Sequence, residues 1–387
     1  MITRIKNGKL ILRDKVAEKQ YLYFENGVIK DITDEEKSFD CEIDAEGNYV
    51  SPGFIDVHIH GGGGYDFMDG GTEPIINALD FHLKHGTTSV LPTTLASSNE
   101  TLLSFLRDLR TVVENKMSRC NVLGTHLEGP YFNISQCGAQ NPDYIKEPDR
   151  AEYEKIYNEG KGLIRKWSFA PELNGSEEFC SFLVKNSIIP SVGHSNGTYT
   201  DFEKVYNLGL RNVTHLYSGM STITRYNGYR ILGITECAYL FDGMIAEVIA
   251  DGCHLPPELL KLIVKNIGKD NICLITDAMR GAGMKEGESQ LGRKGESVPC
   301  IIEDGVAKLL DRTSFAGSIA TADRLVRTMV EMAEVPLNDA VKMMTENPAK
   351  MLGLSKKGVL QEDYDADIVI FDKNINIKSV IVNGNVF

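Results

Sequence analysis

The stretch PGFIDVHIHG, residues 52–61, is a short apolar run that opens on proline and glycine and closes on two histidines. A run of this length between such residues is typical of a buried β-strand. Because side chains alternate along a strand, His58 and His60 should point to the same side. Imidazole is a common ligand of divalent transition metals, but an H-x-H pair also occurs by chance, so other residues must support a metal site.

Downstream of this strand, short apolar runs alternate with longer helical patterns, which indicates βα units around a parallel sheet. The eight candidate strands are Gly53–His58, Thr88–Thr94, Val122–Leu127, Trp167–Pro171, Ile188–Gly193, Asn212–Leu216, Glu247–Ala250 and Ile272–Thr276. Helical patterns include Ile75–Lys84, Thr101–Asn115, Glu177–Lys185, Pro257–Asn266 and Ala322–Ala333. Eight strands in about 250 residues is the size of a (β/α)8 TIM barrel. A doubly wound open sheet is the alternative, but no G-x-G-x-x-G follows the first strand.

The two ends of the chain differ from its middle. Short apolar runs occupy residues 2–29, and similar runs return near the C-terminus, between residues 367 and 382. Asn-Gly pairs are strong hairpin signals, so we expect turns at Asn7-Gly8 and Asn26-Gly27. We predict a small β-sandwich domain made of residues 1–51 and 358–387, and a catalytic barrel over residues 52–357. Gly281–Arg312 interrupts the barrel pattern, and we expect an inserted loop or hairpin there, with a turn at residues 303–305.

Seven side chains with metal-binding or acid–base chemistry fall at or just past the ends of predicted strands: His58, His60, Glu128, His194, His215, His254 and Asp277. The carboxyl ends of the strands form the active-site face of a (β/α)8 barrel, so these groups should converge. Each residue alone has an ordinary structural explanation, such as a hydrogen-bonded core histidine or an Asp that caps a helix. Their common position favours a divalent metal centre. We interpret His82 and His85, on a helical pattern, as structural. His126 lies deeper in the barrel, and we interpret it as either a core histidine or one that supports the ligands from behind.

The composition limits the partners. The formal net charge is -13, which argues against nucleic acid and anionic membranes because both require a basic surface. Eight cysteines are scattered without a C-x-x-C pair, so we expect neither a disulfide framework nor a zinc knuckle. No apolar run approaches the roughly 18 residues of a membrane span, and no signal-peptide pattern opens the chain. We therefore expect a cytoplasmic protein.

The ordered motifs resemble the amidohydrolase superfamily, whose barrel begins with a strand that ends in H-x-H. Many members carry a carboxylated lysine at the end of strand four, but here that strand ends in Ala170-Pro171-Glu172. Strand three ends in HLEGP, residues 126–130, which is similar to the N-acetylglucosamine-6-phosphate deacetylase family. The motifs VGHS (192–195), THLY (214–217), IADGCH (249–254), TDA (276–278) and AGS (316–318) follow in the order of that family. The likeness covers nearly the whole chain.

The resemblance implies deacetylation of N-acetylglucosamine 6-phosphate with a divalent metal, as one or two ions of zinc or iron. It implies that Glu128, His194 and His215 bind the main ion. His58 and His60 can hold a second ion, with Glu128 as a bridge. A bound metal lowers the pKa of its water and polarises the acetamide carbonyl. Asp277 is then implied as the general base and acid, and His254 as a contact to the sugar or the acetyl carbonyl.

Three loops depart from the family pattern. Ser218-Gly219-Met220 replaces Asn-Ala-Met, Gly138-Ala139-Gln140 replaces Gly-Ala-His, and Arg225-Tyr226-Asn227-Gly228 replaces Arg-Glu-Pro-Gly. In the family these loops face the phosphate and the neighbouring subunit, and members are commonly dimers, so a homodimer is expected. The candidate substrate-binding residues are therefore Ala139, Gln140, Ser218, Gly219, Arg225 and His254. A guanidinium suits bidentate phosphate binding, whereas the change from His to Gln removes a cation.

Three alternatives stay open at this stage. The altered loops allow another phosphorylated N-acyl amino sugar, such as N-acetylgalactosamine 6-phosphate, as the substrate. A cyclic-amide hydrolase of the same superfamily is disfavoured because the strand-four lysine is missing. A catalytically inactive barrel scaffold is disfavoured because every candidate ligand and Asp277 are present.

Overall fold

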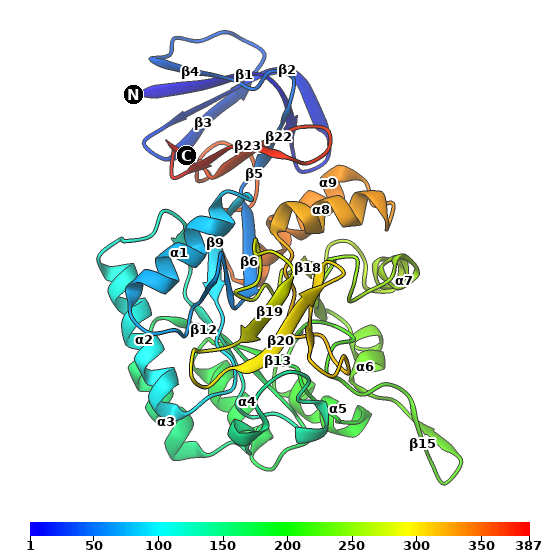
Figure 1. The fold of residues 1–387 in the computed structure, drawn as a ribbon. Helices are drawn as coiled ribbons and strands as arrows, with labels where there is room; N and C mark the ends of the chain where they lie inside the picture. The colour runs from blue at the N-terminus through cyan, green and yellow to red at the C-terminus, as the bar shows by residue number, and fades with distance from the viewer.

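A computed structural model describes residues 1–387 and divides the chain into two parts (Figure 1). Strands from both ends of the chain, drawn in blue and red, form a sheet at the top of the view. The middle of the chain forms a larger α/β part below it. No helix has the length and apolar character that a membrane crossing requires.

Strands make up both parts of the molecule. They are β1 Ile2–Ile11, β2 Val16–Glu25, β3 Val28–Thr33, β4 Cys41–Asp44, β5 Tyr49–Pro52, β6 Phe54–Ile59, β7 Gly61–Gly62, β8 Tyr65–Asp66, β9 Thr87–Pro92, β10 Asn121–Val122, β11 Thr125–Glu128, β12 Ile164–Phe169, β13 Ile189–Val192, β14 Asn212–Val213, β15 Thr224–Tyr226, β16 Tyr229–Ile231, β17 Ile245–Val248, β18 Ile272–Leu274, β19 Gly287–Leu291, β20 Val298–Glu303, β21 Val306–Leu309, β22 Ile368–Phe371, β23 Ile377–Val382 and β24 Asn385–Val386. The helices are α1 Thr72–Leu83, α2 Asn99–Glu114, α3 Arg150–Glu159, α4 Ser176–Lys185, α5 Tyr199–Asn207, α6 Ile234–Leu240, α7 Pro257–Ile267, α8 Ala322–Glu331, α9 Leu337–Met343 and α10 Glu346–Met351.

The terminal sheet runs in the order β24-β23-β22-β5-β1-β2-β3, with β4 paired to β1. The antiparallel pairing of β22 with β5 joins the two ends of the chain, as the sequence indicated. The sheet has its own core of 13 buried residues, among them Ile5, Leu22 and Ile370. A sandwich of two sheets was expected. Hydrogen bonding instead makes one sheet, because β1 pairs with β4 along its first half and with β5 along its second.

The two N-terminal Asn-Gly pairs behave differently. Asn26 (φ 50°) and Gly27 (φ 77°) form the expected turn between β2 and β3. The turn expected at Asn7-Gly8 is wrong, because both residues lie inside the ten-residue strand β1, where its register with β2 shifts. Asn7 has a φ of 53° at this irregularity. A bulge and a primed turn both use left-handed backbone, so the same dipeptide fits either.

The α/β part contains two parallel sheets, β10-β9-β6 and β11-β12-β13-β14-β17-β18. The larger sheet follows chain order without a reversal, so the doubly wound alternative is wrong. Backbone contacts connect the two sheets at both edges. A bridge between Thr93 and His126 links β9 to β11, and the amide of Asp277 donates to the carbonyl of His58 at 2.9 Å. The carboxyl ends of the parallel strands therefore face the same side.

Several strands differ in extent from the sequence expectation. The strand expected at Val122–Leu127 is interrupted around Gly124, whose φ is 131°, and becomes β10 and β11. The strand expected at Asn212–Leu216 ends at Val213, because His215 takes a left-handed φ of 29°. Strand β12 begins at Ile164, three residues before the expected start at Trp167. The sequence expectation began too late because Lys166, which is fully buried, interrupts the apolar pattern.

The expected insertion is a three-stranded antiparallel sheet, β19-β20-β21. Asp304 (φ 54°) and Gly305 (φ 76°) form the predicted turn between β20 and β21. Leu291 of β19 and Phe315, which follows β21, line a cavity at the ends of the parallel strands. The insertion therefore forms one wall of the site described next.

Candidate active site and metal centre

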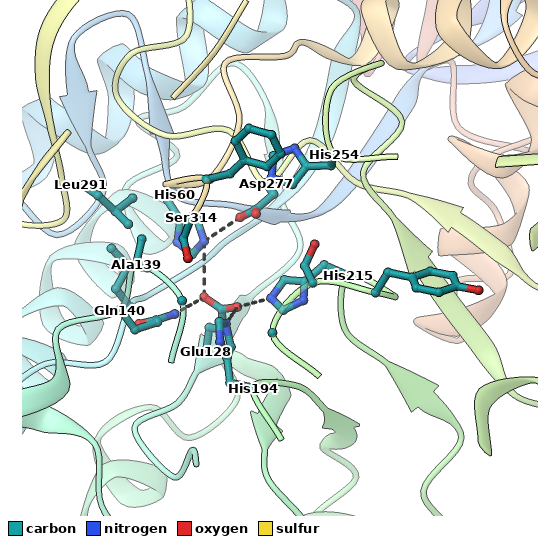
Figure 2. Close-up of a pocket in the computed structure, with 17 residues that line it drawn as sticks. His60, Glu128, Ala139, Gln140, His194, His215, His254, Asp277, Leu291 and Ser314 are labelled. Carbon is teal, nitrogen blue, oxygen red and sulfur yellow. Dashed lines mark hydrogen bonds and ion pairs between the residues drawn. The ribbon is translucent and has the colours of Figure 1, made fainter. Parts of the chain in front are cut away.

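A cavity of about 270 Å³ is lined by residues that end or follow the parallel strands. Figure 2 shows His60, Glu128, His194, His215 and Asp277 pointing toward one another in it. The remaining wall residues come from loops and from the inserted sheet: Leu95, Gly138, Ala139, Gln140, Tyr217, Ser218, Gly219, His254, Leu291, Ser314, Phe315 and Gly317. The convergence predicted from the strand ends is therefore present.

The carboxylate of Glu128, the last residue of β11, lies at the centre of the cluster. Its Oε1 is 3.1 Å from Nε2 of His194 and 2.8 Å from Nε2 of His215. His194 is oriented by its other ring nitrogen, Nδ1, which lies 2.9 Å from the carbonyl oxygen of Gln136. Two imidazole nitrogens thus approach the same carboxylate oxygen.

A second group of ligand atoms lies beside the first. His58 is in β6 and His60 follows it, and their Nε2 atoms are 3.3 Å apart, on the same side as period 2 requires. Oδ1 of Asp277 is 3.0 Å from Nε2 of His60 and 3.5 Å from Nε2 of His58. Oε2 of Glu128 is 3.4 Å from Nε2 of His60, so this carboxylate faces both groups.

Three of these residues occupy left-handed backbone. His194, His215 and Asp277 have φ values of 46°, 29° and 49°, shortly after the ends of β13, β14 and β18. Residues other than glycine rarely adopt this region, because Cβ is crowded there. Conformations of this kind cluster at functional sites, where they fix the direction of a side chain.

The electrostatics of the cluster favour positive charge. Burial alone would lower the pKa of His58, but the carboxylates of Glu128 and Glu247 raise it to about 10. Burial would raise the pKa of Glu128, but the charge of His58 and a hydrogen bond with His194 hold it well below its usual value. The pKa of Asp277 is also lowered: burial raises it, but the hydrogen bond with His60 and the charges of His58, His60 and His215 together outweigh burial. The site therefore keeps its carboxylates ionised and attracts a cation.

The donor set fits a divalent transition metal. The ligand atoms of His58, His60 and Asp277 lie within 4.8 Å of one another, and so do those of His58, Glu128 and His215. All five residues are buried. Neutral imidazole and carboxylate are ligands of zinc and of iron, and this mixture does not distinguish the two.

Gln140 lines the cavity, but both ends of its amide are engaged. Its Nε2 group donates to Oε2 of Glu128 at 2.6 Å, and its Oε1 accepts from the backbone amide of Ala96 at 2.7 Å. A carboxylate only accepts and a backbone amide only donates, so these partners fix the orientation of the side chain. Gln140 therefore contacts a candidate metal ligand rather than open space. Its neighbour Ala139 forms part of the same wall.

In a second altered loop, Gly219 lies against His194. Gly219 has a φ of 56°, and a Cβ atom there would stand 2.8 Å from Nδ1 of His194. A side chain at this position would therefore displace the imidazole. Ser218 lines the cavity beside it.

His254 lies on the opposite wall and is held by Asp251. Nδ1 of His254 is 2.8 Å from Oδ2 of Asp251, whose other oxygen accepts from the backbone amides of Cys253 and His254. Burial raises the pKa of Asp251, but the hydrogen bonds and charge of His254 and the amide of Cys253 together lower it below its usual value. The ring of Phe315 packs on His254, with centroids 4.6 Å apart.

Arg225 does not line the cavity of its own chain. It lies in β15, which pairs with β16 in an exposed hairpin, and Arg230 stands directly opposite it. Figure 1 shows this hairpin projecting from the molecule at the lower right. The expectation that Arg225 contacts a substrate is therefore not met within one chain, because the hairpin extends away from the body.

The histidines interpreted as structural have structural partners. Nε2 of His82 lies 2.9 Å from the carbonyl oxygen of Gly61, and His85 pairs with Asp323. Nε2 of His126 lies 2.7 Å from Oγ of Ser168. Three buried residues that contact the cluster or its neighbours were not among the predicted site residues: Asp251, Lys166 and Glu247. The available signal for Lys166 and Glu247 was a charged residue inside a buried strand.

Imidazoles and carboxylates at the carboxyl ends of parallel strands form a candidate divalent-metal site, the arrangement with which metal-dependent hydrolases activate water. The amidohydrolase family pattern matches residues 49–387, and the chain belongs to this family, within the branch of N-acetylglucosamine-6-phosphate deacetylases.

The chain is similar in sequence and in structure to several known proteins. It is 35% identical over 345 residues to an N-acetylglucosamine-6-phosphate deacetylase of Lysinibacillus sphaericus, covering 89% of this chain and 87% of the relative. It is 32% identical over 347 residues to an N-acetylgalactosamine-6-phosphate deacetylase of Escherichia coli O157:H7, covering 89% and 88%. Among solved structures, a mutant N-acetyl-D-glucosamine-6-phosphate deacetylase from Mycobacterium smegmatis, in complex with N-acetyl-D-glucosamine-6-phosphate, superimposes with a TM-score of 0.90 at 27% identity. That match covers 100% of this chain and 98% of the other.

Proposed function

We propose that this hydrolase removes the acetyl group from N-acetylglucosamine 6-phosphate and yields glucosamine 6-phosphate and acetate. The observation that carries the proposal is the convergence of Glu128, His194, His215, His60 and Asp277 on one cavity. Relatives with that activity match the chain over nearly its full length, which supports the same chemistry here.

The cofactor that we propose is zinc or iron, as one or two ions. Glu128, His194 and His215 would hold the main ion, and His58 and His60 a second, with Glu128 between them. When bound, a divalent ion lowers the pKa of a coordinated water towards about 7 and polarises a carbonyl.

Asp277 is the general base and then the general acid of the proposed reaction. Its lowered pKa keeps the carboxylate ionised and ready to take a proton from the attacking water. Amines leave a tetrahedral centre poorly unless protonated, so the same carboxyl can return that proton to the departing nitrogen. His254, fixed by Asp251, would contact the sugar or the acetyl carbonyl.

The phosphate requires a cation that the cavity itself does not supply, because none of its lining residues is a lysine or an arginine. We therefore propose a homodimer in which the projecting hairpin brings Arg225 to the partner's cavity. Arg225 and Arg230 stand side by side on that hairpin, and guanidinium groups bind phosphate in a bidentate manner. Ala139, Ser218 and Gly219 would form the sugar-facing wall.

We also propose the architecture that this chemistry requires. The contacts at both sheet edges support a closed (β/α)8 barrel over residues 52–357. The separate core of the terminal sheet supports a second domain of residues 1–51 and 358–387. A cytoplasmic location is part of the same proposal.

A second substrate, N-acetylgalactosamine 6-phosphate, is favoured by the Escherichia coli relative at 32% identity. Acetate release from both epimers, each with and without the phosphate, separates the candidates. Preference for the phosphorylated gluco epimer supports the proposal. Preference for the galacto epimer would change the proposed substrate to N-acetylgalactosamine 6-phosphate and leave the proposed deacetylation unchanged. A purified chain that neither retains nor takes up divalent metal would instead support an inactive scaffold.

A further inference from the structure

A buried ion pair lies beneath the candidate metal centre. Lys166 of β12 and Glu247 of β17 come from separate strands, and both side chains have no exposed surface. The ammonium group of Lys166 donates to Oε1 of Glu247. The other carboxylate oxygen, Oε2, lies 3.2 Å from Nδ1 of His58. The three side chains thus form a line that ends on a proposed metal ligand.

The ring of His58 therefore has two different environments. Nδ1 faces the Glu247 carboxylate, which can only accept a hydrogen bond, so Nδ1 carries the proton. Nε2 lies 3.5 Å from Oε1 of Glu128 and 3.5 Å from Oδ1 of Asp277, and a bound ion would displace the proton of this nitrogen and take its lone pair. In the opposite tautomer an N–H would point into the cluster and block an ion.

Packing does not explain the pair. Removing two charges from water costs several kcal/mol per ion, and apolar residues of the same volume often stabilise a core equally well. Lys166 is needed if Glu247 is needed, because an unpaired carboxylate at this depth would be strongly unfavourable. The position of Glu247 behind His58 is the feature that an apolar residue cannot reproduce.

We propose that Glu247 is a positioning residue that fixes the tautomer and ring direction of His58 for metal binding, with Lys166 as its dedicated counter-ion. This inference rests on the metal centre of the proposed function. Carboxylates that hold a metal-bound histidine in this way commonly tune metal affinity by 10–100-fold.

Zinc affinity, measured by chelator competition on the full-length protein, tests the proposal without any need for turnover. The variant Lys166→Met/Glu247→Met keeps the volume and removes both charges together with the acceptor. We expect its weakest-bound zinc ion to dissociate about 10–100-fold more readily than in the wild type. The variant Lys166→Met/Glu247→Gln keeps a neutral acceptor behind His58, so zinc affinity should recover toward the wild-type value.

A matched control is Lys357→Met/Asp367→Asn, which disrupts another largely buried ion pair. This pair lies at the opposite end of β6 from His58, where the carbonyl of Asp367 accepts from the amide of Gly53. It should lower stability without changing zinc affinity. Unchanged zinc affinity in a folded Met/Met variant would overturn the proposal, as would equal losses in the Met/Met and Met/Gln variants. Acetate release by the wild type reports separately on the proposed function, so failure of one is distinguishable from failure of the other.

A neutron structure of the zinc-loaded wild type tests the same claim without a substitution, should the Met/Met variant not fold. Deuterium on Nδ1 of His58 and none on Nε2 is expected. Deuterium on Nε2 with a bare Nδ1 would overturn the proposal.

Discussion

The substitution Gln140→Met tests how the candidate metal ligand Glu128 is held. Methionine keeps the length and unbranched shape of glutamine but has no amide. It therefore removes the donor to Oε2 of Glu128 at 2.6 Å and the acceptor for the amide of Ala96 at 2.7 Å. Gln140 is only 5% exposed, so water cannot replace these partners freely.

The magnitude follows from the two bonds. A hydrogen bond to a charged group contributes about 1.5–3 kcal/mol, and a neutral one about 0.5–1.5 kcal/mol. The loss of both hydrogen bonds should lower the unfolding free energy of the metal-free protein by about 2–4 kcal/mol. Urea unfolding monitored by circular dichroism measures this loss, with the exposed glutamine in Gln361→Met as the control. A change below about 0.5 kcal/mol, the usual effect of a surface substitution, would refute the reasoning.

Three further predictions concern catalysis, pH and the phosphate. Asp277→Asn should lower the turnover of metal-loaded protein by about 10²–10⁴-fold while the protein still binds metal, and near-normal turnover would exclude Asp277 as the base. Burial lowers the pKa of His82 from 6.5 to about 4. Between these pH values the unfolded chain binds a proton at His82 and the folded protein does not, so the protein loses stability as pH falls from 6.5 through about 4. The full effect on the unfolding free energy is about 3 kcal/mol. In His82→Gln the unfolding free energy, measured with urea between pH 6.5 and 4, should depend less on pH than in the wild type, and an unchanged pH dependence would contradict the assignment to His82. Arg225→Ala should raise KM for the phosphorylated sugar far more than it lowers turnover of the unphosphorylated one, and equal effects in steady-state assays would rule out a phosphate contact.

The sequence was sufficient to predict the part of the site that depends on strand periodicity. An apolar run that closes on H-x-H predicts that His58 and His60 share one side, and their Nε2 atoms are 3.3 Å apart. Likewise, a parallel sheet brings strand ends together, so Glu128 and Asp277 could be expected near them whatever the intervening loops.

Most features that the sequence did not predict depend on contacts between residues that are distant along the chain. Lys166 and Glu247 are 81 positions apart, and each alone looks like an interruption of an apolar strand. The orientation of Gln140 depends on Ala96, a loop residue with no sequence signal. The Asn7-Gly8 pair shows a local ambiguity, because a bulge and a primed turn use the same backbone conformation.

The most direct test of the central claim is acetate release from N-acetylglucosamine 6-phosphate by zinc- or iron-loaded protein, compared with its Glu128→Gln variant. Equal amounts of acetate and free amine from the wild type, lost in the variant and in chelator-treated protein, are the predicted result. Wild-type protein with metal firmly bound that releases no acetate from this sugar would contradict the account.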